Sequence, residues 1–339
     1  MGVTLKDIAK DLGVSIVTVS KVLRNHDDIG PETRARVQKR LKELNYQPNL
    51  AARALVTGRT SLMGLVVPDL VHSFFAQLAK ELSRVLRKKG YGLIISSSDE
   101  DHELENEEIA HMLARNVDVL LIASAQPDAS LFRQLAEQRK PFVLIDRHFD
   151  DLKANFIGTD DRRAGMIATE HLIENGCRRI AHIAGEGVSP ANEREAGYRS
   201  ALMKHGLPVP DNYVSSRARG DESGSLAGYD AMKALLGLTP RPDGVFCYND
   251  PMASGAMQAI LEAGLRIPRD IAIVGCGNVQ YAPMLRVPLT SIDQDSATLA
   301  ERSAKLALSL VGKTDAVRSK TILTEPKLVI RESSRRASI

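Results

Sequence analysis

Apolar residues near the start of the chain recur with helical spacing, in two short runs separated by a glycine. The first run, residues 5–12, has apolar side chains at i, i+3, i+4 and i+7, which form one face of a two-turn helix. We expect Thr4 to cap this helix, with Asp7 completing a capping box three residues later. Gly13 is suited to the tight turn that ends it.

Two further short helices are predicted after this turn. Ser15 is a good N-cap for the second helix, and Pro31 follows Gly30 as a favoured first residue of the third. The apolar residues expected to pack among the three helices are Val19, Val22, Leu23, Val37, Leu41 and Leu44. Three short helices with a glycine turn between the first two are typical of a helix-turn-helix unit.

The start of the second helix has side chains suited to reading DNA. A helix-turn-helix unit presents the N-terminal residues of its second helix to base edges. Ile16 and Val17 would contact thymine methyl groups, and Lys21 would donate to guanine O6 and N7. Thr18 and Ser20 are suited to phosphate contacts. The alternative is that Ile16 and Val17 pack in a small core.

The run NYQPNLAARAL, Asn45 to Leu55, allows two more helical turns. So short a helix is marginal by itself in water. It would form when DNA or a partner offsets its ordering cost. The alternative is a plain interdomain linker.

The order of TLKDIAKDLGVSIVTVSKVL, PETRARV and LNYQPNLAARAL resembles the headpiece of the lactose- and galactose-repressor family, and the similarity runs the length of the chain. The resemblance implies that the segment after the third helix is a hinge helix. Paired in a homodimer, two hinge helices enter the minor groove, and Leu55 wedges into a base step. Gly30 and Val56 depart from the residues common in relatives. The residues expected to contact DNA are Thr4, Ser15, Ile16, Val17, Thr18, Ser20, Lys21, Asn49, Ala52 and Leu55.

From residue 62 onward, short apolar runs alternate with amphipathic helical stretches. The predicted strands are 62–68, 91–97, 117–123, 141–146, 179–185, 243–249 and 270–276. Continuous apolar strands with helices between them indicate parallel sheets covered on both faces. The expected fold is an all-α helix-turn-helix headpiece followed by an α/β core of two doubly wound lobes. The resemblance implies that this core is like a periplasmic binding protein.

The resemblance also implies that the two lobes exchange chain segments late in the sequence. We expect crossings near Asp160 and Ile292, with a return near Thr321. The expected domains are a headpiece at 1–47, a hinge and linker at 48–60, a first lobe at 61–160 with 293–320, and a second lobe at 161–292 with 321–333.

Polar and aromatic side chains follow the ends of the predicted strands, which is where open parallel sheets bind ligands. Carboxylates, amides, two arginines and paired phenylalanines suit a sugar-like polyol, and the same positions line the effector pocket in the family. The residues expected to bind an effector are Asp69, Phe74, Phe75, Asp146, Arg147, Asp160, Arg194, Asn249, Asp250 and Asn278. The alternatives are that Asp146 or Asp160 caps the following turn, and that Asn249 and Asp250 start a helix.

Two stretches of the core need separate interpretations. Gly277 stands where many relatives carry an aspartate that grips the ligand, so either Asn278 takes that role or the effector differs from the usual sugar or purine. The acidic run at 96–108 is expected to be a solvated helix start, with its acids near the positive end of the helix dipole.

Composition limits the class of protein. With 339 residues, 43% of them hydrophobic and 26% charged, the chain should form two or three globular domains. It has no run of eighteen apolar residues and a charged start, so we expect a cytoplasmic protein without a membrane helix. The three cysteines (Cys177, Cys247 and Cys276) lack metal-ligand spacing and are expected to be buried thiols.

Charge is distributed unevenly. Residues 1–59 carry eleven Lys or Arg and six Asp or Glu, a net charge of +5, although the whole chain is only +3. The remaining residues therefore have a net charge of −2. A basic head on a mildly acidic body suggests that the head meets a polyanion.

No catalytic motif stands out. The sequence has no HExxH pairing, no phosphate loop and no convincing nucleophile–base pair, so we expect no enzyme activity, no metal and no cofactor. The tail after Thr324 lacks leucine heptads, so a homodimer is expected. The sequence favours a ligand-regulated transcription factor, more often a repressor, and leaves induction or corepression open. The rivals are a sugar-binding protein of transport or chemotaxis and an enzyme on a doubly wound fold.

Overall fold

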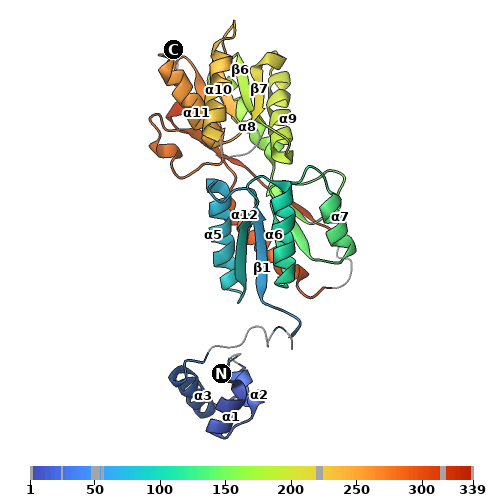
Figure 1. Ribbon diagram of the computed structural model, residues 1–339. Coiled ribbons are helices and arrows are strands. Elements are labelled where there is room, and N and C mark those ends of the chain that lie inside the picture. Colours follow the sequence, from blue (N-terminus) through green and yellow to red (C-terminus); the bar gives the residue numbers. More distant parts are fainter. Residues whose placement is uncertain are drawn as a thin grey trace. The chain divides into compact units, whose positions relative to one another are not determined.

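The computed structural model describes residues 3–23, 26–46, 54, 57–218, 224–313 and 318–336 (Figure 1). Its contacts divide the chain into two compact units, Met1–Thr60 and Ser61–Ile339. None of the helices in this described part combines the length and hydropathy that a bilayer crossing requires.

The first unit contains the three helices expected from the sequence: α1 (Leu5–Leu12), α2 (Ile16–Leu23) and α3 (Pro31–Glu43). The capping box at the start of α1 is present, since Thr4 and Asp7 exchange side-chain-to-backbone hydrogen bonds. Gly13 ends α1 with φ 66°, a left-handed conformation that glycine adopts without strain.

A small core joins these helices. Ile8, Ala9, Val19, Val22 and Val37 form its buried cluster. Leu23 was expected to belong to this core, but it is 36% exposed. It is the last residue of α2, and Val19 and Val22 already fill the space against the other two helices.

The first lobe of the second unit is a six-stranded sheet with the strand order β11-β5-β4-β3-β1-β2. All of its pairs are parallel. Its strands are β1 (Leu62–Val67), β2 (Gly92–Ser97), β3 (Val119–Ile122), β4 (Phe142–Ile145), β5 (Phe156–Thr159) and β11 (Thr321–Thr324). Its helices are α5 (Ser73–Arg87), α6 (His102–Ala114), α7 (Ser130–Glu137) and α12 (Ser296–Leu310).

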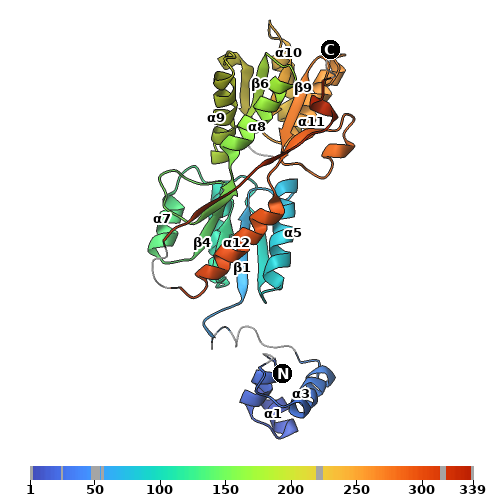
Figure 2. The same ribbon diagram turned by 180° about the vertical axis from the view of Figure 1, so that it is seen from behind.

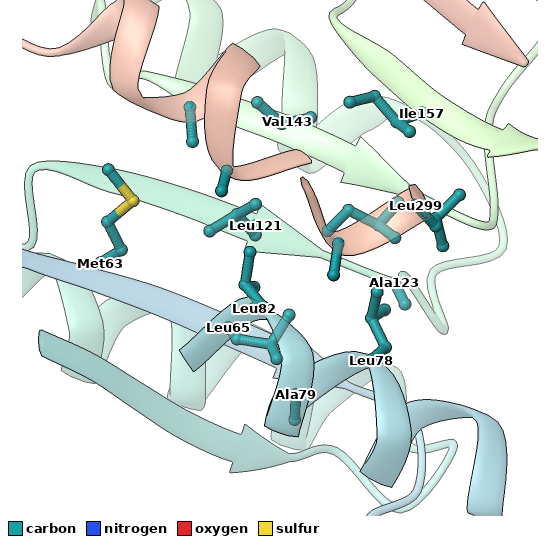
Figure 3. Packing of buried hydrophobic residues seen from close by; sticks show 14 of the residues in the cluster. Met63, Leu65, Leu78, Ala79, Leu82, Leu121, Ala123, Val143, Ile157 and Leu299 are labelled. Carbon is teal, nitrogen blue, oxygen red and sulfur yellow. The ribbon is translucent and has the colours of Figure 1, made fainter. Parts of the chain in front are cut away.

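Helices cover both faces of this sheet. Side chains of α5 and α12 pack with β1, β3, β4 and β5 in one apolar cluster, part of which is shown in Figure 3. Side chains of α6 and α7 pack in a second cluster with the alternate residues of the same strands. Burial on both faces explains why β1, β3 and β4 read as continuous apolar runs.

The second lobe repeats this design, with the strand order β12-β10-β9-β8-β6-β7. Only β12 runs antiparallel to its described neighbour. Its strands are β6 (Ile180–Gly185), β7 (Val214–Ala218), β8 (Gly244–Cys247), β9 (Ala272–Cys276), β10 (Thr290–Asp293) and β12 (Lys327–Val329). Helices α8 (Asp161–Glu174) and α9 (Ser189–Lys204) cover one face, and α10 (Gly224–Leu236) and α11 (Asp250–Glu262) cover the other.

The chain passes between the lobes three times. It leaves the first sheet after β5, returns between β10 and α12, and leaves again between β11 and β12, the dark red stretch in Figure 2. The last passage was expected near Thr321, but residues 321–324 pair with β5 in the first sheet. The half-exposed alternation of β11, typical of an edge strand, fits either sheet and so did not indicate its lobe.

Candidate functional site

The exposed start of α2 is the candidate DNA-binding surface. Ile16 is 47% exposed and Val17 is 60% exposed, so the alternative in which both pack in the core is wrong. Ser15 caps the helix, because its Oγ accepts a hydrogen bond from the Thr18 amide at 3.0 Å. The two hydroxyls also hydrogen-bond each other at 2.8 Å. The side chains of Ile16 and Val17 are thus exposed to solvent, next to the hydrogen-bonded hydroxyls of Ser15 and Thr18.

Lys21 lies one turn further along α2 and forms an ion pair with Asp28. This contact lowers the pKa of the Asp28 carboxyl, with the hydrogen bond from Lys21 as the main cause. The Lys21 side chain remains 35% exposed. Its ammonium therefore already has one carboxylate partner before any nucleic acid approaches.

The other residues predicted to contact DNA are Thr4, Ser20 and three residues of the hinge segment. The Thr4 hydroxyl donates to the Asp7 carboxylate at 2.6 Å as part of the helix cap. Ser20 is half-buried. Asn49, Ala52 and Leu55 lie outside the described residues.

In the second unit, Asp69, Phe74 and Phe75 follow β1, as expected. The Asp69 carboxylate accepts the Val71 amide at 2.6 Å. Both phenylalanines are buried in the α5 cluster with their ring centroids 5.1 Å apart. The Phe75 ring lies 6.0 Å from the guanidinium carbon of Arg147. The two rings therefore support the site from the core of the first lobe.

Arg147 is buried after β4 and is held by Glu100 through two hydrogen bonds. Its Nη1 donates to one Glu100 oxygen at 2.8 Å, and its Nη2 donates to the other at 2.6 Å. Nη1 also donates to the Ser124 carbonyl at 3.0 Å. The neighbouring Asp146 is buried as well and has a left-handed backbone with φ 64°.

Arg194 is the corresponding buried cation of the second lobe. Its Nε and Nη2 both lie 2.7 Å from the Asp161 Oδ1, and its Nη1 donates to the Tyr248 carbonyl at 2.9 Å. Burial raises the pKa of Asp161, and Arg194 opposes that rise. Asp160 instead caps α8, accepting the Arg163 amide at 2.9 Å, which is the structural alternative considered for it.

Asn249 and Asp250 follow β8 and bond to neighbouring groups of the second lobe. Asn249 caps α11 by accepting the Met252 amide at 2.9 Å. Asp250, which is fully buried, accepts the Ser291 hydroxyl at 2.6 Å and the Val279 amide at 2.9 Å. Burial raises the pKa of Asp250 to about 6. Asn249 and Asp250 therefore start a helix, the structural alternative considered for them.

The Asn278 side chain is hydrogen-bonded within the second lobe. Its amide nitrogen donates to Asp293 at 3.0 Å, and its amide oxygen accepts a hydrogen bond from Arg331 at 2.7 Å. Both functional atoms of the side chain thus tie the turn after β9 to β10 and to the chain after β12.

Two hollows share the residues 148–150 that follow Arg147, and Arg147 itself lines only the first of them. One, of about 350 Å³, is lined by residues of both lobes, among them Ser124, Gln126, Arg147, Ser189 and Glu193. A second, of about 330 Å³, shares Glu193 with it and is lined by Asp160 and Asp161. The Ser189 hydroxyl bridges the lobes by accepting the His148 amide at 2.9 Å. These contacts bring carboxylates, hydroxyls and a guanidinium together where the lobes meet.

Several of these residues were not predicted. Ser124 lies in the loop after β3, and Ser189 begins α9 after β6, so the same strand-end rule would have found them. Glu100 and Glu105 were placed in a solvated acidic run. Glu105 is instead fully buried and accepts the Ser124 hydroxyl at 2.8 Å. No local pattern separates these two acids from their exposed neighbours.

Metal binding and thiol chemistry find no support in the described residues. No three His, Cys, Asp or Glu side chains in the described ranges are grouped so that they could hold a metal ion. Burial raises the pKa of Cys177 and Cys276 to about 12, which keeps both thiols protonated at neutral pH.

Comparison with known proteins places both units. Residues 4–49 match the family of bacterial regulatory proteins named after lacI, and residues 169–334 match the periplasmic binding protein-like domain. The HTH-type transcriptional regulator GalR of Salmonella typhimurium is 35% identical over 91% of this chain and 90% of its own length.

Solved structures of transcriptional regulators are also similar to this chain over nearly its whole length. The lac repressor dimer bound to operator and the anti-inducer ONPF aligns with a TM-score of 0.85 and 28% identity, over 98% of this chain and 99% of the other. A complex of the transcriptional regulator CelR with cellobiose aligns with a TM-score of 0.74 and 29% identity, over 98% and 99% of the two chains. These relatives are regulators of transcription and not transport proteins or enzymes, and the chain belongs to the lacI family of bacterial regulatory proteins.

Proposed function

We propose that the chain is a cytoplasmic repressor that binds a pseudo-palindromic operator as a homodimer. The observation that carries this proposal is the exposure of Ile16 and Val17 at the start of α2, inside a unit that matches the lacI model. Exposed aliphatic side chains are costly in water but favourable against thymine methyl groups. Two such units would read half-sites about one helical turn apart, roughly 34 Å.

The segment 48–60 serves as the hinge in this proposal. Ordering it on DNA costs conformational entropy, which contact with a second copy and with the minor groove offsets. Leu55 is the proposed wedge between two base pairs, while Asn49 and Ala52 accompany it in the groove.

The second part of the proposal is that a sugar-like effector binds between the two lobes. Buried polar groups from both lobes support this: Asp146 and Arg147 on one side, and Arg194 on the other. The complex of CelR with cellobiose shows that a structural neighbour binds a sugar. Asp69 and Phe75 complete the first-lobe side.

Effector binding would change the operator affinity through the lobes. Because the chain passes between the lobes three times, a change in their closure moves several segments together. A coupling of about 1–3 kcal/mol would change operator affinity roughly 5- to 150-fold. The scheme holds whether the effector releases the protein from its operator or strengthens its binding to the operator.

A gel-shift titration of the full chain against DNA fragments at several salt concentrations tests the proposal. Specific binding should weaken as salt rises, with a slope of about −0.9 per neutralised phosphate. Ile16→Ala should reduce specific binding, while Val3→Ala, an exposed change outside α2, should not. Absence of salt-sensitive DNA binding would favour a sugar-binding protein without a regulatory role.

A further inference from the structure

The strands of the first lobe all start at one end of their sheet. Its described pairs are parallel, and a helix between two parallel strands returns the chain to the start of the next one, so α5, α6 and α7 end there as well (Figure 1). The Gly92 amide donates to the Ser61 carbonyl at 2.9 Å, and the Phe156 amide donates to the Lys320 carbonyl at 2.8 Å. We call the segments that precede the strands here the basic end: residues 88–91, 115–118, 138–141, 153–155, 311–313 and 318–320.

The basic end has nine Lys or Arg side chains and one carboxylate, Asp118. All nine cations are exposed, and none of them forms a salt bridge within the described ranges. Asp315, which lies outside the described residues, is the one further carboxylate in the connection from 311 to 320. The residues after 59 have a net charge of −2 in total, so this charge is concentrated at one end. The nine cations are Lys88, Lys89, Arg115, Arg139, Lys140, Lys153, Lys313, Arg318 and Lys320.

Helix stabilisation explains only part of this charge. Cations stabilise the carboxyl end of a helix through its dipole, but the effect falls off within the last turn. Arg318 and Lys320 stand eight and ten residues beyond Leu310, where α12 ends, and Lys153 lies in the loop between β4 and β5. These three cations lie at the basic end without a helix terminus that needs them.

The chain enters the core at the basic end. Ser61 leads directly into β1, and its amide donates to the Asp118 carboxylate at 3.0 Å. Leu55, the proposed wedge, precedes Ser61 by six residues, which span at most about 20 Å when fully extended. In the proposed complex the basic end is therefore within reach of the duplex that the hinge enters.

We infer that the basic end is a second DNA-binding surface, which contacts backbone phosphates near the hinge. Exposed cations without carboxylate partners suit a polyanion, and phosphate contacts by Lys and Arg require no particular base. The surface adds affinity for any sequence, while α2 supplies the sequence preference. This inference rests on the proposed function and adds a DNA contact made by the core itself.

The double variant Lys88→Gln, Lys89→Gln tests the inference in the full chain. The matched control is Arg241→Gln, Arg269→Gln, which removes two exposed cations of the second lobe that also form no salt bridge in the described part of the chain. Thermal unfolding verifies that both variants are folded. Anisotropy titrations over a salt series measure binding to an operator selected from a randomised pool and to a scrambled duplex.

The Lys88, Lys89 double variant should bind both duplexes more weakly than the control, by a similar factor. Its slope of log K against log salt should be shallower by about 1–4 units, since a dimer loses four lysines and each phosphate contact contributes about 0.9. A rise from 50 to 200 mM salt should therefore cost the variant at least about 3-fold less affinity than it costs the wild type.

Affinities and slopes equal to those of the control would overturn the inference, because the basic end would then serve another polyanion or none. A loss confined to the operator would overturn it too, since phosphate contacts have no base preference. If the wild type itself fails to bind DNA, the proposed function falls together with the inference. If the wild type binds and the two double variants behave alike, only the inference falls.

A DNA-cleaving label tests the position of the surface directly. The three native cysteines are buried, so a thiol-reactive iron–EDTA reagent should label an introduced cysteine selectively. Lys89→Cys carrying the label should cleave the operator near the hinge site, and labelled Arg241→Cys should not. Equal cleavage from both positions, or none from either, by proteins that gel shifts show to be bound would overturn the inference.

Discussion

The ion pair between Lys21 and Asp28 places a negative charge beside the helix that is proposed to enter the major groove. Lys21 must leave this carboxylate, or share it, in order to donate to a guanine. Asp28 also repels nearby phosphates. The pair therefore favours sites at which the gain from a base contact exceeds the cost of separating the two side chains, which sharpens selectivity at the expense of affinity.

Asp28→Asn should tighten binding to non-specific DNA, because it removes one repelling charge and releases Lys21. The slope of log K against log salt should become steeper by about one unit. Adding Lys21→Ala should cancel the gain, and Asp27→Asn serves as the control for charge alone. Anisotropy titrations over a salt series measure these slopes. If Asp27→Asn and Asp28→Asn behave alike, the ion pair has no specific role.

Lys21→Ala should relax sequence preference at one base pair per half-site. The expected loss is about 1–3 kcal/mol for the preferred base and little for the others. Binding to a library in which each operator position is varied in turn measures this. Unchanged preference at every position would show that Lys21 contacts only the backbone.

His182 is a buried histidine whose neutral form the second lobe requires. Its Nδ1 lies 3.0 Å from the Phe246 carbonyl, and its ring stacks on Phe246 with centroids 4.8 Å apart. Burial lowers the pKa of His182 from 6.5 to about 4. Between these two values the unfolded chain binds a proton that the folded chain does not, so stability falls as the pH falls.

His182→Phe should remove this acid sensitivity. Compared with the variant, the wild type should lose up to about 1.4 kcal/mol of unfolding free energy per pH unit between pH 6.5 and pH 4. Phe246→Leu disturbs the same packing but keeps the titrating ring, so it should retain the wild-type pH dependence. Urea unfolding at several pH values gives the comparison. Parallel curves for wild type and His182→Phe would contradict the assignment.

Helices α8 and α9 approach each other closely enough to need glycine at their contact. A Cβ atom on Gly165 would lie 2.1 Å from the Arg194 carbonyl oxygen, and one on Gly197 would lie 2.1 Å from the Arg162 carbonyl oxygen. The two glycines thus hold together the helices that carry Asp161 and Arg194. The geometry of the ion pair depends on this backbone contact.

Gly165→Ala should push α9 away from α8, at a cost of about 1–3 kcal/mol in unfolding free energy. It should also weaken effector binding more than stability alone explains, because Arg194 moves with its helix. Gly237→Ala is a suitable control, since its Cβ would meet only an ordinary contact of 3.4 Å. Urea unfolding and sugar-induced thermal shifts measure the two effects. Equal stability of both variants would rule out the tight contact.

Insertion of the hinge segment into the minor groove can be tested at Leu55. Leu55→Ala should weaken specific operator binding more than non-specific binding, because without the wedge the duplex is not kinked. Gel shifts with operator and with scrambled DNA measure the two affinities. An equal loss on both would show that Leu55 is not inserted.

The architecture of the whole molecule was largely predictable, and the errors have local causes. Strands β1, β3 and β4 were predicted because parallel strands buried on both faces are continuously apolar. Strands β5 and β10, with the sequences FIGT and TSID, are short and carry polar residues, so they gave no such pattern. The headpiece helices were predicted because their caps and apolar spacing are local.

The candidate cleft was only partly predictable. Arg147 was found because it stands just beyond a strand end, and Arg194 because it lies in the helix that follows a strand. Their carboxylate partners were harder to assign, since Glu100 lies 47 residues from Arg147 and Asp161 lies 33 residues from Arg194. Ion pairs between residues so far apart in the sequence depend on the tertiary fold, and local sequence patterns do not predict them.

Selection of binding sites from a randomised DNA pool by the full chain is the most direct measurement of the central claim. The account predicts enrichment of a pseudo-palindrome whose half-sites are about one helical turn apart, and loss of that enrichment when Ile16 and Val17 are both changed to alanine. A pool that shows no enriched sequence, or the same sequence with the double variant, would contradict the claim that α2 reads an operator.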